Sequence, residues 1–547
     1  MNHFYVCLYL FSALFLGINQ TTSSQTIKRP SFAARTTTAI TIDSIQRKTE
    51  LTRLYITLRY FPNKAVTLEK DIRLTDFKNH ASWKATDMEG GDLGRRIMIP
   101  ESGKMALFID FPAIPASVRY VDLINTSPDF PFKIIDIPLF DCHTSANTRQ
   151  TPLPPIQKRQ PGKRPQSGTS VVHVQLNGYH TRLGIDTALF IETNLITGEQ
   201  KRIPKKIDPA GRFSVVFPQS YPQQQTLFLP YGYIHFYSEP GDELFISAEL
   251  EEMAVPYQKP EEAELNYTHL RYEGDQAKTN QELKTIRTTM YRLFPPTPIE
   301  IQGLSAQAYK QKIVQLAQQQ QQVLDSLIEA LHVGEKAADI ARKSFQCSVA
   351  NRLFDFEYKK RLQKNPVSLP SDYYRIDLTA LGSPSSLFAT EYLNLIDRLE
   401  LSQIMADGKK SVTGNDVIAA FYRLKIPLTS DEQELIRYSF SMKTPSDTAG
   451  ISDFHRRTKA FNQQYPALQL AAREQALLPK YRSTLSQTMG MDSELLSEIL
   501  YGRRVILSLY ALKSVLSDKE LSAFYQPITQ QEIRTAIQSE YLKSTRK

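Results

Sequence analysis

The chain has 547 residues, more than one hydrophobic core supports, so about three domains are expected. Hydrophobic residues make up 41% and charged residues 22% of the sequence, a globular composition that excludes disorder over the whole length. The net charge is +9, but the basic residues are spread along the chain and do not alternate with aromatic residues in one motif. Nucleic acid is therefore not an expected partner.

The first residues predict an export signal. The apolar run FYVCLYLFSALFLG, residues 4–17, is too short to cross a bilayer as a helix, and a polar stretch follows it. A signal peptide is therefore expected over 1–24, although the preceding MNH lacks the usual Lys or Arg. An uncleaved anchor or a misassigned start is the alternative. No later stretch predicts a transmembrane segment, so the mature chain is expected in the periplasm or associated with the cell envelope.

Two cysteines, Cys142 and Cys347, remain after the predicted signal. The sequence leaves open whether they pair, because sequence separation says nothing about geometry. A packed side chain or a free thiol is the expected state of each. No CxxC motif is present, so the chain is not expected to carry its own dithiol redox centre.

Residues 36–143 predict a β-sandwich domain. Short runs alternate apolar with polar residues, as at Leu54, Ile56 and Leu58, and Pro, Asn, Asp and Gly separate the runs. Trp83, the only tryptophan, is expected in the core. The acidic segment Asp87–Asp92 lacks the alternating oxygen ligands of a calcium loop and predicts a hairpin loop.

A second β-sandwich domain is expected over 171–272, after a Pro-rich basic linker over 144–170. Two turns fix its character. Asp208–Gly211 predicts a hairpin turn in which the glycine takes positive φ, and Glu239–Asp242 predicts a Pro-Gly turn that joins two strands.

Helical periodicity runs through the rest of the chain and predicts an all-α domain over 273–547. Asp275 is the expected N-cap of the first helix. Apolar residues repeat along one face of 306–331, with Gln320 interrupting the stripe, and 336–362 is apolar on several sides, as expected for a central helix. Three capping boxes are predicted, at Ser430 with Gln433, Ser517 with Glu520, and Thr529 with Glu532. The fold class is therefore α+β, with two N-terminal β-sandwiches followed by a long helical region.

The sequence contains no metalloprotease, P-loop, nucleophile-elbow or EF-hand motif, so no catalytic, cofactor-binding or metal-binding residue is assigned and no cofactor is expected. The histidines His173, His180 and His235 all lie in the second β-domain, but none has metal-ligand spacing with a second His or Cys, so no metal site is expected there. The carboxylate pairs Glu251–Glu252 and Glu261–Glu262 are expected to be solvated in an exposed polar connector. The aromatic cluster of Tyr231, Tyr233, Phe236 and Tyr237 is expected to pack in the core and at the edge of the second sandwich.

Three short motifs resemble the region upstream of the thioredoxin domain in extracytoplasmic TlpA-like thiol-disulfide oxidoreductases. They are Gly211-Arg212-Phe213, Glu239-Pro240-Gly241-Asp242, and the Glu273–Asn280 entry into a long helical segment. The hairpin departs from the family's Asp-Gly form. The resemblance implies a thioredoxin domain from about Lys547 onward, and its catalytic dithiol has no counterpart in these 547 residues. No catalytic residue is therefore carried over.

The expected function is that of a non-catalytic extracytoplasmic binding or scaffold protein that resembles the accessory part of such an oxidoreductase. The alternative is a truncated or split thiol-disulfide oxidoreductase whose CxxC domain is on another chain. An enzyme of unrecognised type is the third hypothesis, with a site in the helical region or between domains. The expected partners are a separate thioredoxin-like chain or another envelope protein.

Overall fold

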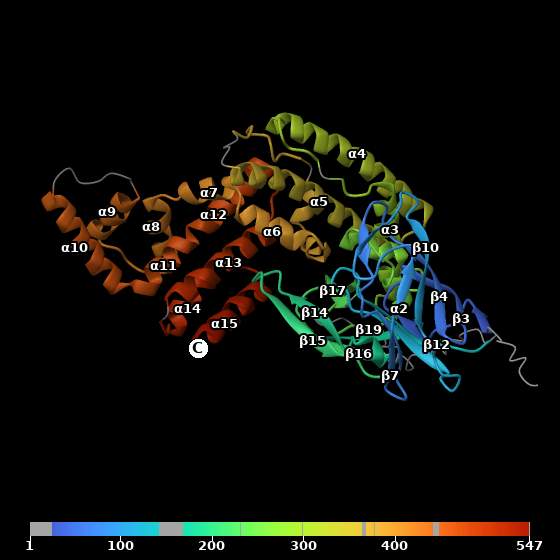
Figure 1. Ribbon diagram of the computed structural model, residues 1–547. Helices are drawn as coiled ribbons and strands as arrows, with labels where there is room; N and C mark the ends of the chain where they lie inside the picture. Colours follow the sequence, from blue (N-terminus) through green and yellow to red (C-terminus); the bar gives the residue numbers. More distant parts are fainter. Residues whose placement is uncertain are drawn as a thin grey trace, which may run out of the picture.

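The computed structural model describes residues 25–141 and 168–545, apart from positions 230, 298, 364–367, 377, 441–447 and 513. It confirms the α+β class, because strands dominate up to Gly274 and helices fill the chain after it (Figure 1). The predicted signal peptide, Cys142 and nearly all of the predicted linker lie outside the described residues. No helix in the described ranges is long and apolar enough to cross a membrane.

The first β region consists of two antiparallel five-stranded sheets, with strand orders β1-β3-β4-β10-β8 and β2-β12-β11-β6-β7, and a separate pair β5-β9. Its first strand starts at Gln25, before the predicted domain start at residue 36. The strands are β1 (Gln25–Lys28), β2 (Ala34–Arg35), β3 (Ile40–Arg47), β4 (Leu51–Arg59), β5 (Ala65–Thr67), β6 (Arg73–Asp76), β7 (Ala81–Lys84), β8 (Asp87–Glu89), β9 (Arg96–Met98), β10 (Lys104–Pro112), β11 (Tyr120–Asn125) and β12 (Phe132–Pro138).

The apolar–polar alternation predicts the buried face of this region correctly. Leu54, Ile56 and Leu58 on β4 are all buried in the first core, and Trp83 packs against the same core while half-buried. The predicted hairpin at Asp87–Asp92 is wrong. Residues 87–89 form β8, which pairs with β10, whereas the next strand, β9, pairs with β5.

The second β region consists of two four-stranded sheets, with strand orders β16-β13-β19-β20 and β15-β14-β17-β18. The pair β13–β19 is parallel and the other pairs are antiparallel. The strands are β13 (Gly168–Asn177), β14 (Thr187–Thr193), β15 (Gln200–Lys206), β16 (Arg212–Gln219), β17 (Gln223–Leu229), β18 (Gly232–Ser238), β19 (Glu243–Glu249) and β20 (Arg271–Gly274).

The two predicted turns form, but the hairpin around the first is wrong. Gly211 has φ +79°, and its amide donates to the Asp208 carbonyl at 2.9 Å. A Cβ at Gly211 would lie 2.5 Å from the Leu176 carbonyl oxygen, so only glycine fits there. The strands on either side, β15 and β16, belong to different sheets, so this turn passes the chain between the layers. The Glu239–Asp242 turn does the same between β18 and β19.

The two β regions pack against each other directly. Ala34 and Ile135 of the first region belong to the hydrophobic core of the second. At the same junction Arg182 forms ion pairs with Asp122 at 3.4 Å and with Asp136. These contacts bury both apolar and charged groups, so the first β region is packed firmly against the second.

The helical region begins at Ala277 and extends to Thr545. Before it, the connector after β19 contains α2 (Leu250–Met253) and a 3-10 helix (Pro260–Asn266). The helices are α3 (Ala277–Leu293), α4 (Ala306–Ala330), α5 (Glu335–Leu362), α6 (Tyr392–Glu400), α7 (Gln403–Lys410), α8 (Gly414–Arg423), α9 (Ser430–Ser439), α10 (Thr448–Gln464), α11 (Pro466–Gln475), α12 (Leu477–Thr484), α13 (Glu494–Leu512), α14 (Asp518–Tyr525) and α15 (Gln531–Thr545).

The predicted faces of the two long helices are confirmed in part. On α4, Ala306, Tyr309, Ile313 and Gln320 are buried as predicted, but the stripe continues through Leu324 and Ile328, whereas the predicted Leu331 is 46% exposed. A straight helix of 3.6 residues per turn favours this drift. The helix α5 is buried on several sides, which confirms its central position.

The predicted caps have mixed outcomes. The Ser517–Glu520 capping box is confirmed. The box predicted at Ser430 forms one residue earlier, between Thr429 and Glu432, because a carboxylate accepts from the cap amide more strongly than the Gln433 amide would. Asp275 is not an N-cap: Gln276 takes that position, and Asp275 accepts from the Glu243 amide at 3.1 Å.

One arginine joins the second β region to the helices. Arg503 of α13 donates to the carbonyls of Leu195 at 2.9 Å and Ile196 at 3.3 Å, in the turn between β14 and β15. It also forms ion pairs with Asp397 at 2.7 Å and Glu400 at 3.2 Å on α6. This β14–β15 hairpin reaches toward α13 and α15 in Figure 1.

Candidate functional site

A cavity of about 410 Å³ lies where the second β region meets the first three long helices. Gln224 of β17 and Glu391, the residue before α6, close one side, and the facing surfaces of α3, α4 and α5 form the rest. Small-molecule sites are concave, mostly apolar and of this size, with a few polar groups that orient the ligand. The arrangement is therefore a candidate binding site.

The helices give the cavity an apolar wall. Leu283 and Ile286 of α3 and Leu324 of α4 are buried and also pack in the hydrophobic cluster behind the cavity. Along α5, residues at positions 341, 344, 345, 348 and 352 face it, because residues three and four apart share one helix face. This α5 stripe changes from apolar to polar along its length, through Ser344 and Ser348 to Arg352.

Arg287 of α3 contributes a neutralised charge to the wall. It forms a bidentate ion pair with the buried Glu264, with its Nε 2.5 Å from Oε2 and its Nη2 2.6 Å from Oε1. The pKa of Glu264 lies below its ordinary value, because the favourable charge and hydrogen bonds of Arg287 outweigh the burial that raises it. Within the described chain this pair is complete, so Arg287 has little remaining charge to offer a ligand.

Arg352 of α5 is different, because within the described ranges no carboxylate lies within ion-pair distance of it. Its Nη1 donates to Gln320 Oε1 at 3.4 Å, a long hydrogen bond to a neutral group. Burial lowers the pKa of Arg352 from its usual range. A half-buried guanidinium without an anionic partner is costly, and an incoming anion would relieve that cost.

Glu391 supplies a partly satisfied carboxylate on the opposite side, where it accepts a hydrogen bond from the Ser344 hydroxyl. Its Oε2 is buried and has no hydrogen-bond partner among the described residues. Burial raises the pKa of Glu391 from 4.5 to about 7, and the positive charge of Arg287 opposes that shift. A buried polar atom without a partner calls for a functional or structural explanation.

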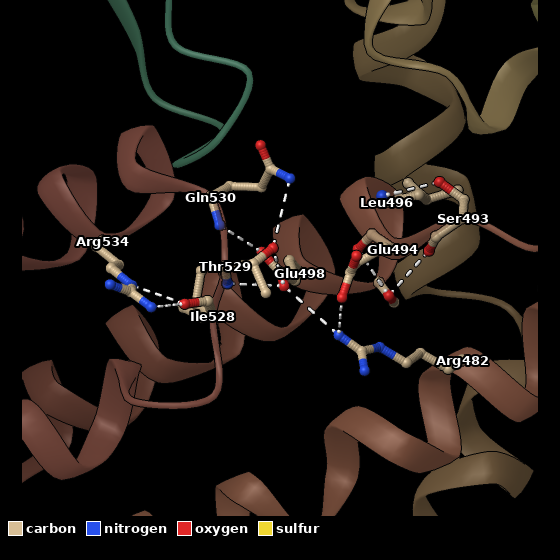
Figure 2. Close-up of polar contacts among 10 residues, drawn as sticks. Arg482, Ser493, Glu494, Leu496, Glu498, Ile528, Thr529, Gln530 and Arg534 are labelled. Atoms are coloured by element: carbon tan, nitrogen blue, oxygen red, sulfur yellow. Dashed lines mark hydrogen bonds and ion pairs between the residues drawn. The ribbon is translucent and has the colours of Figure 1, made fainter.

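The buried Glu498 of α13 shows the opposite arrangement to Glu391 (Figure 2). Its side chain is 0% exposed, and Oε1 accepts from the amide and the hydroxyl of Thr529, both at 2.9 Å. Oε2 accepts from the Gln530 amide at 3.0 Å. These bonds cap the start of α15, so the predicted Thr529–Glu532 capping box is wrong and a residue from another helix takes its place.

The three histidines do not converge. His173 stacks on Phe245 with ring centroids 4.6 Å apart, and its Nδ1 lies 2.8 Å from Ser214 Oγ. His180 accepts from the Arg182 amide at 3.1 Å and caps a short 3-10 helix. His235 lies on the other sheet beside Thr226, and burial lowers its pKa to about 4. No cluster of three or more metal-ligating side chains occurs within the ranges that the structure describes.

The carboxylate pairs expected in an exposed connector are only partly exposed. Glu251 pairs with Arg35 of the first β region, and Glu252 accepts from the His269 amide at 3.0 Å. Glu261 is exposed at the cavity and Glu262 is half-buried. Of the aromatic cluster, Phe236 and Tyr237 are buried, and Tyr237 packs edge-on against Phe388 in the helical region. Tyr237 therefore joins β18 to the helical region, whereas Phe236 packs in the core of the second β region.

The motif Glu273–Asn280 has a structural role beside the cavity. Asn280 Oδ1 accepts from the Tyr237 amide at 2.6 Å, and its Nδ2 donates to the Tyr237 carbonyl at 2.9 Å. Gly274 has φ +88°, and a Cβ there would lie 2.5 Å from the Glu243 carbonyl oxygen. The motif thus fixes α3, one wall of the cavity, against strand β18.

Cys347 lies on α5 behind the cavity and is fully buried. Burial raises the pKa of its thiol well above the ordinary value. Reactive cysteines are accessible and have lowered pKa values, so the role of Cys347 is to pack in the core.

A single signal in the sequence points to the cavity. Gln320, the polar residue in the apolar stripe of α4, is buried and lines it. Arg352, Arg287 and Glu391 belong to no motif, and their proximity depends on the packing of α3, α5 and α6.

Comparison of the chain with protein-family models, curated proteins and solved structures finds no match. The resemblance to the TlpA-like region therefore stays a prediction.

Proposed function

We propose that this chain is a non-catalytic extracytoplasmic binding protein whose site is the cavity between β17 and the helices α3, α4 and α5. The single observation that carries the proposal is the pairing of an apolar wall with two incompletely satisfied polar groups in one cavity. Arg352 has only a long hydrogen bond to the neutral Gln320, and Glu391 Oε2 has no hydrogen-bond partner among the described residues. A stably folded protein rarely keeps such groups unless a ligand or water satisfies them.

The proposal also includes export of the chain from the cytoplasm and a resemblance to the accessory region of TlpA-like proteins. The apolar run at residues 4–17 supports an extracytoplasmic location, and the three short motifs support a likeness to the accessory region of TlpA-like proteins. The motif residues Gly211, Gly274 and Asn280 hold the β layers and α3 in place. In this proposal the accessory region binds a small ligand, and an envelope protein or a separate thioredoxin-like chain is its partner.

The described residues favour no thiol chemistry on this chain. Cys347 is buried and its pKa is raised, the opposite of what thiol–disulfide exchange requires. No second function is therefore proposed.

The ligand can be tested on protein isolated from its own envelope without denaturation. Native mass spectrometry of the wild type should reveal a bound small molecule, and Ser348→Trp should lose it, because the indole would fill the cavity from the middle of the α5 stripe. The matched control is Ser326→Trp, at an exposed position on α4. An unliganded wild type that no small molecule stabilises against heat would contradict the proposal.

Export can be tested separately by sequencing the N-terminus of the mature chain after cell fractionation. Cleavage between residues 17 and 25 and recovery in the envelope fraction are expected. An intact Met1 in the cytoplasmic fraction would contradict the proposed location.

A further inference from the structure

The cavity presents one unpaired cation and one unpaired carboxylate oxygen to the same space. Of the other charged side chains in the lining, Arg287 is neutralised by Glu264 and Glu261 is exposed. Arg352 and Glu391 form no ion pair with each other, because the guanidinium donates to Gln320 and Glu391 Oε2 has no hydrogen-bond partner among the described residues. A ligand that carries only one charge would satisfy one of these groups and leave the other unpartnered in a desolvated site.

The two groups lie toward different ends of the α5 stripe. The Glu391 carboxylate lies near Ser344, whose hydroxyl also accepts from Gln224 Nε2 at 3.3 Å. Arg352 is eight residues further along the helix, which corresponds to about 12 Å at 1.5 Å per residue. The arginine side chain is long enough to bend into that interval, and Ser348 lies within it.

The interval between them is bordered by apolar side chains. Leu283, Ile286 and Met290 of α3 face it from one side and Leu324 of α4 from another. A complementary ligand therefore has a positive group, an apolar middle and a negative group within a short length.

We propose that the cavity binds a small apolar zwitterion, a peptide of two or three residues with free ends. Its amino group lies at Glu391, its carboxylate at Arg352 and its apolar side chains against α3 and α4. This assignment rests on the proposed binding function and names its ligand class. Arg352 is suited to the carboxylate because a guanidinium binds it through two parallel hydrogen bonds.

The experiment uses the full mature chain and two probes, which are Leu-Leu and Leu-Leu-Leu, with affinity measured by calorimetry. At least one probe should bind. Blocking its amino group by acetylation, or its carboxylate by amidation, should weaken binding at least tenfold in each case. Equal binding of the free and blocked forms, or no binding of either probe, would overturn the inference.

Two substitutions assign each end of the ligand to a residue. In Glu391→Gln the tenfold preference for a free amino group should disappear while the preference for a free carboxylate remains, and Arg352→Gln should show the reverse. The preference is a ratio measured within one variant, so it does not depend on the fraction of folded protein. The controls are Glu329→Gln and Lys359→Gln, exposed residues on α4 and α5, which should keep both preferences.

The outcomes separate this inference from the proposed function. If native mass spectrometry finds a bound molecule that Ser348→Trp excludes, but both probes fail, the ligand class is wrong and the binding function stands. If an apolar acid binds as tightly as a zwitterion of the same size, Glu391 does not recognise the ligand and the inference fails. If no small molecule is retained or stabilises the chain, both proposals fail.

Discussion

The junction of α13 with α15 contains a fully buried glutamate, Glu498, and the cavity beside α5 contains a half-buried one, Glu391, and the two are satisfied in opposite ways. Glu498 at the junction accepts three hydrogen bonds shorter than 3.1 Å, from Thr529 and Gln530 (Figure 2). Glu391 at the cavity keeps one oxygen without a partner. Because burial of a charged group is costly unless it is fully bonded, the first arrangement stabilises the fold and the second is available for binding.

Glu264 provides a third case for this comparison, because its carboxylate is paired with an arginine, Arg287, and not with backbone amides. We expect Glu264→Ala to lower the free energy of unfolding by about 4 kcal/mol, since it removes the buried partner of the pair and leaves the half-buried Arg287 unpaired. The double variant Glu264→Leu with Arg287→Met should lose far less, because no charge then remains buried. Urea denaturation measures both. Equal losses in the single and double variants would show that packing, and not charge, dominates at this site.

The Glu498 junction gives the next largest expected effect. Glu498→Ala leaves the amides of Thr529 and Gln530 without their acceptor, and we expect a loss of about 3 kcal/mol in the free energy of unfolding. The control is Glu494→Ala on the same helix, a half-exposed partner of Arg482 at 2.9 Å, for which about 0.5 kcal/mol is expected. Similar losses in the two variants would remove the distinction between buried and surface carboxylates.

Glu391 should show its effect as a dependence on pH. The pKa is raised from 4.5 to about 7 in the folded state, so the folded chain binds this proton more tightly than the unfolded chain does. Stability from this group is therefore present below pH 4.5 and is lost as the pH rises to about 7. At about 1.4 kcal/mol per pKa unit this shift corresponds to about 3.5 kcal/mol. Because the Glu391 side chain is only half-buried, solvent screening reduces that figure, and Glu391→Gln should be more stable than the wild type by about 2 kcal/mol above pH 7.5.

The measurement is urea denaturation at pH 4.5, 6 and 8, where the advantage of Glu391→Gln should grow with pH. Glu329→Gln, at an exposed position on α4, should follow the wild type throughout. Parallel profiles for the wild type and Glu391→Gln would mean that Glu391 is solvated, which would weaken the contrast with Glu498.

The sequence predicts this molecule well where one element carries its own signal. Leu54, Ile56 and Leu58 alternate and are buried together, and Gly211 and Gly241 both take positive φ in predicted turns. Strand β15 carries a weaker signal, because it is an edge strand whose QKRIPKK sequence is largely exposed and basic. Such residues protect a sheet edge from pairing with other chains and hide the strand from a search for apolar alternation.

The sequence fails to predict features that depend on contacts between distant elements. Thr529 has Glu532 at capping-box spacing, yet its hydrogen bonds go to Glu498, 31 residues earlier. Glu391 and Arg352 have no local pattern because their environment is created by the packing of other helices. Gln320 is the exception, since a polar residue within an apolar stripe can be recognised from spacing alone.

Glu520 provides the smallest expected effect and the closest match to Glu498. Its Oε2 accepts from the Ser517 amide at 2.9 Å and the Ser517 hydroxyl at 2.7 Å, the same two kinds of donor that Glu498 accepts from Thr529. Because Ser517 is exposed and Glu520 is only half-buried, water can replace the carboxylate, so Glu520→Ala should lower the free energy of unfolding by about 0.5 kcal/mol. Urea denaturation beside Glu498→Ala checks this. A loss near 3 kcal/mol would mean that the donors themselves, and not their burial, set the cost at both sites.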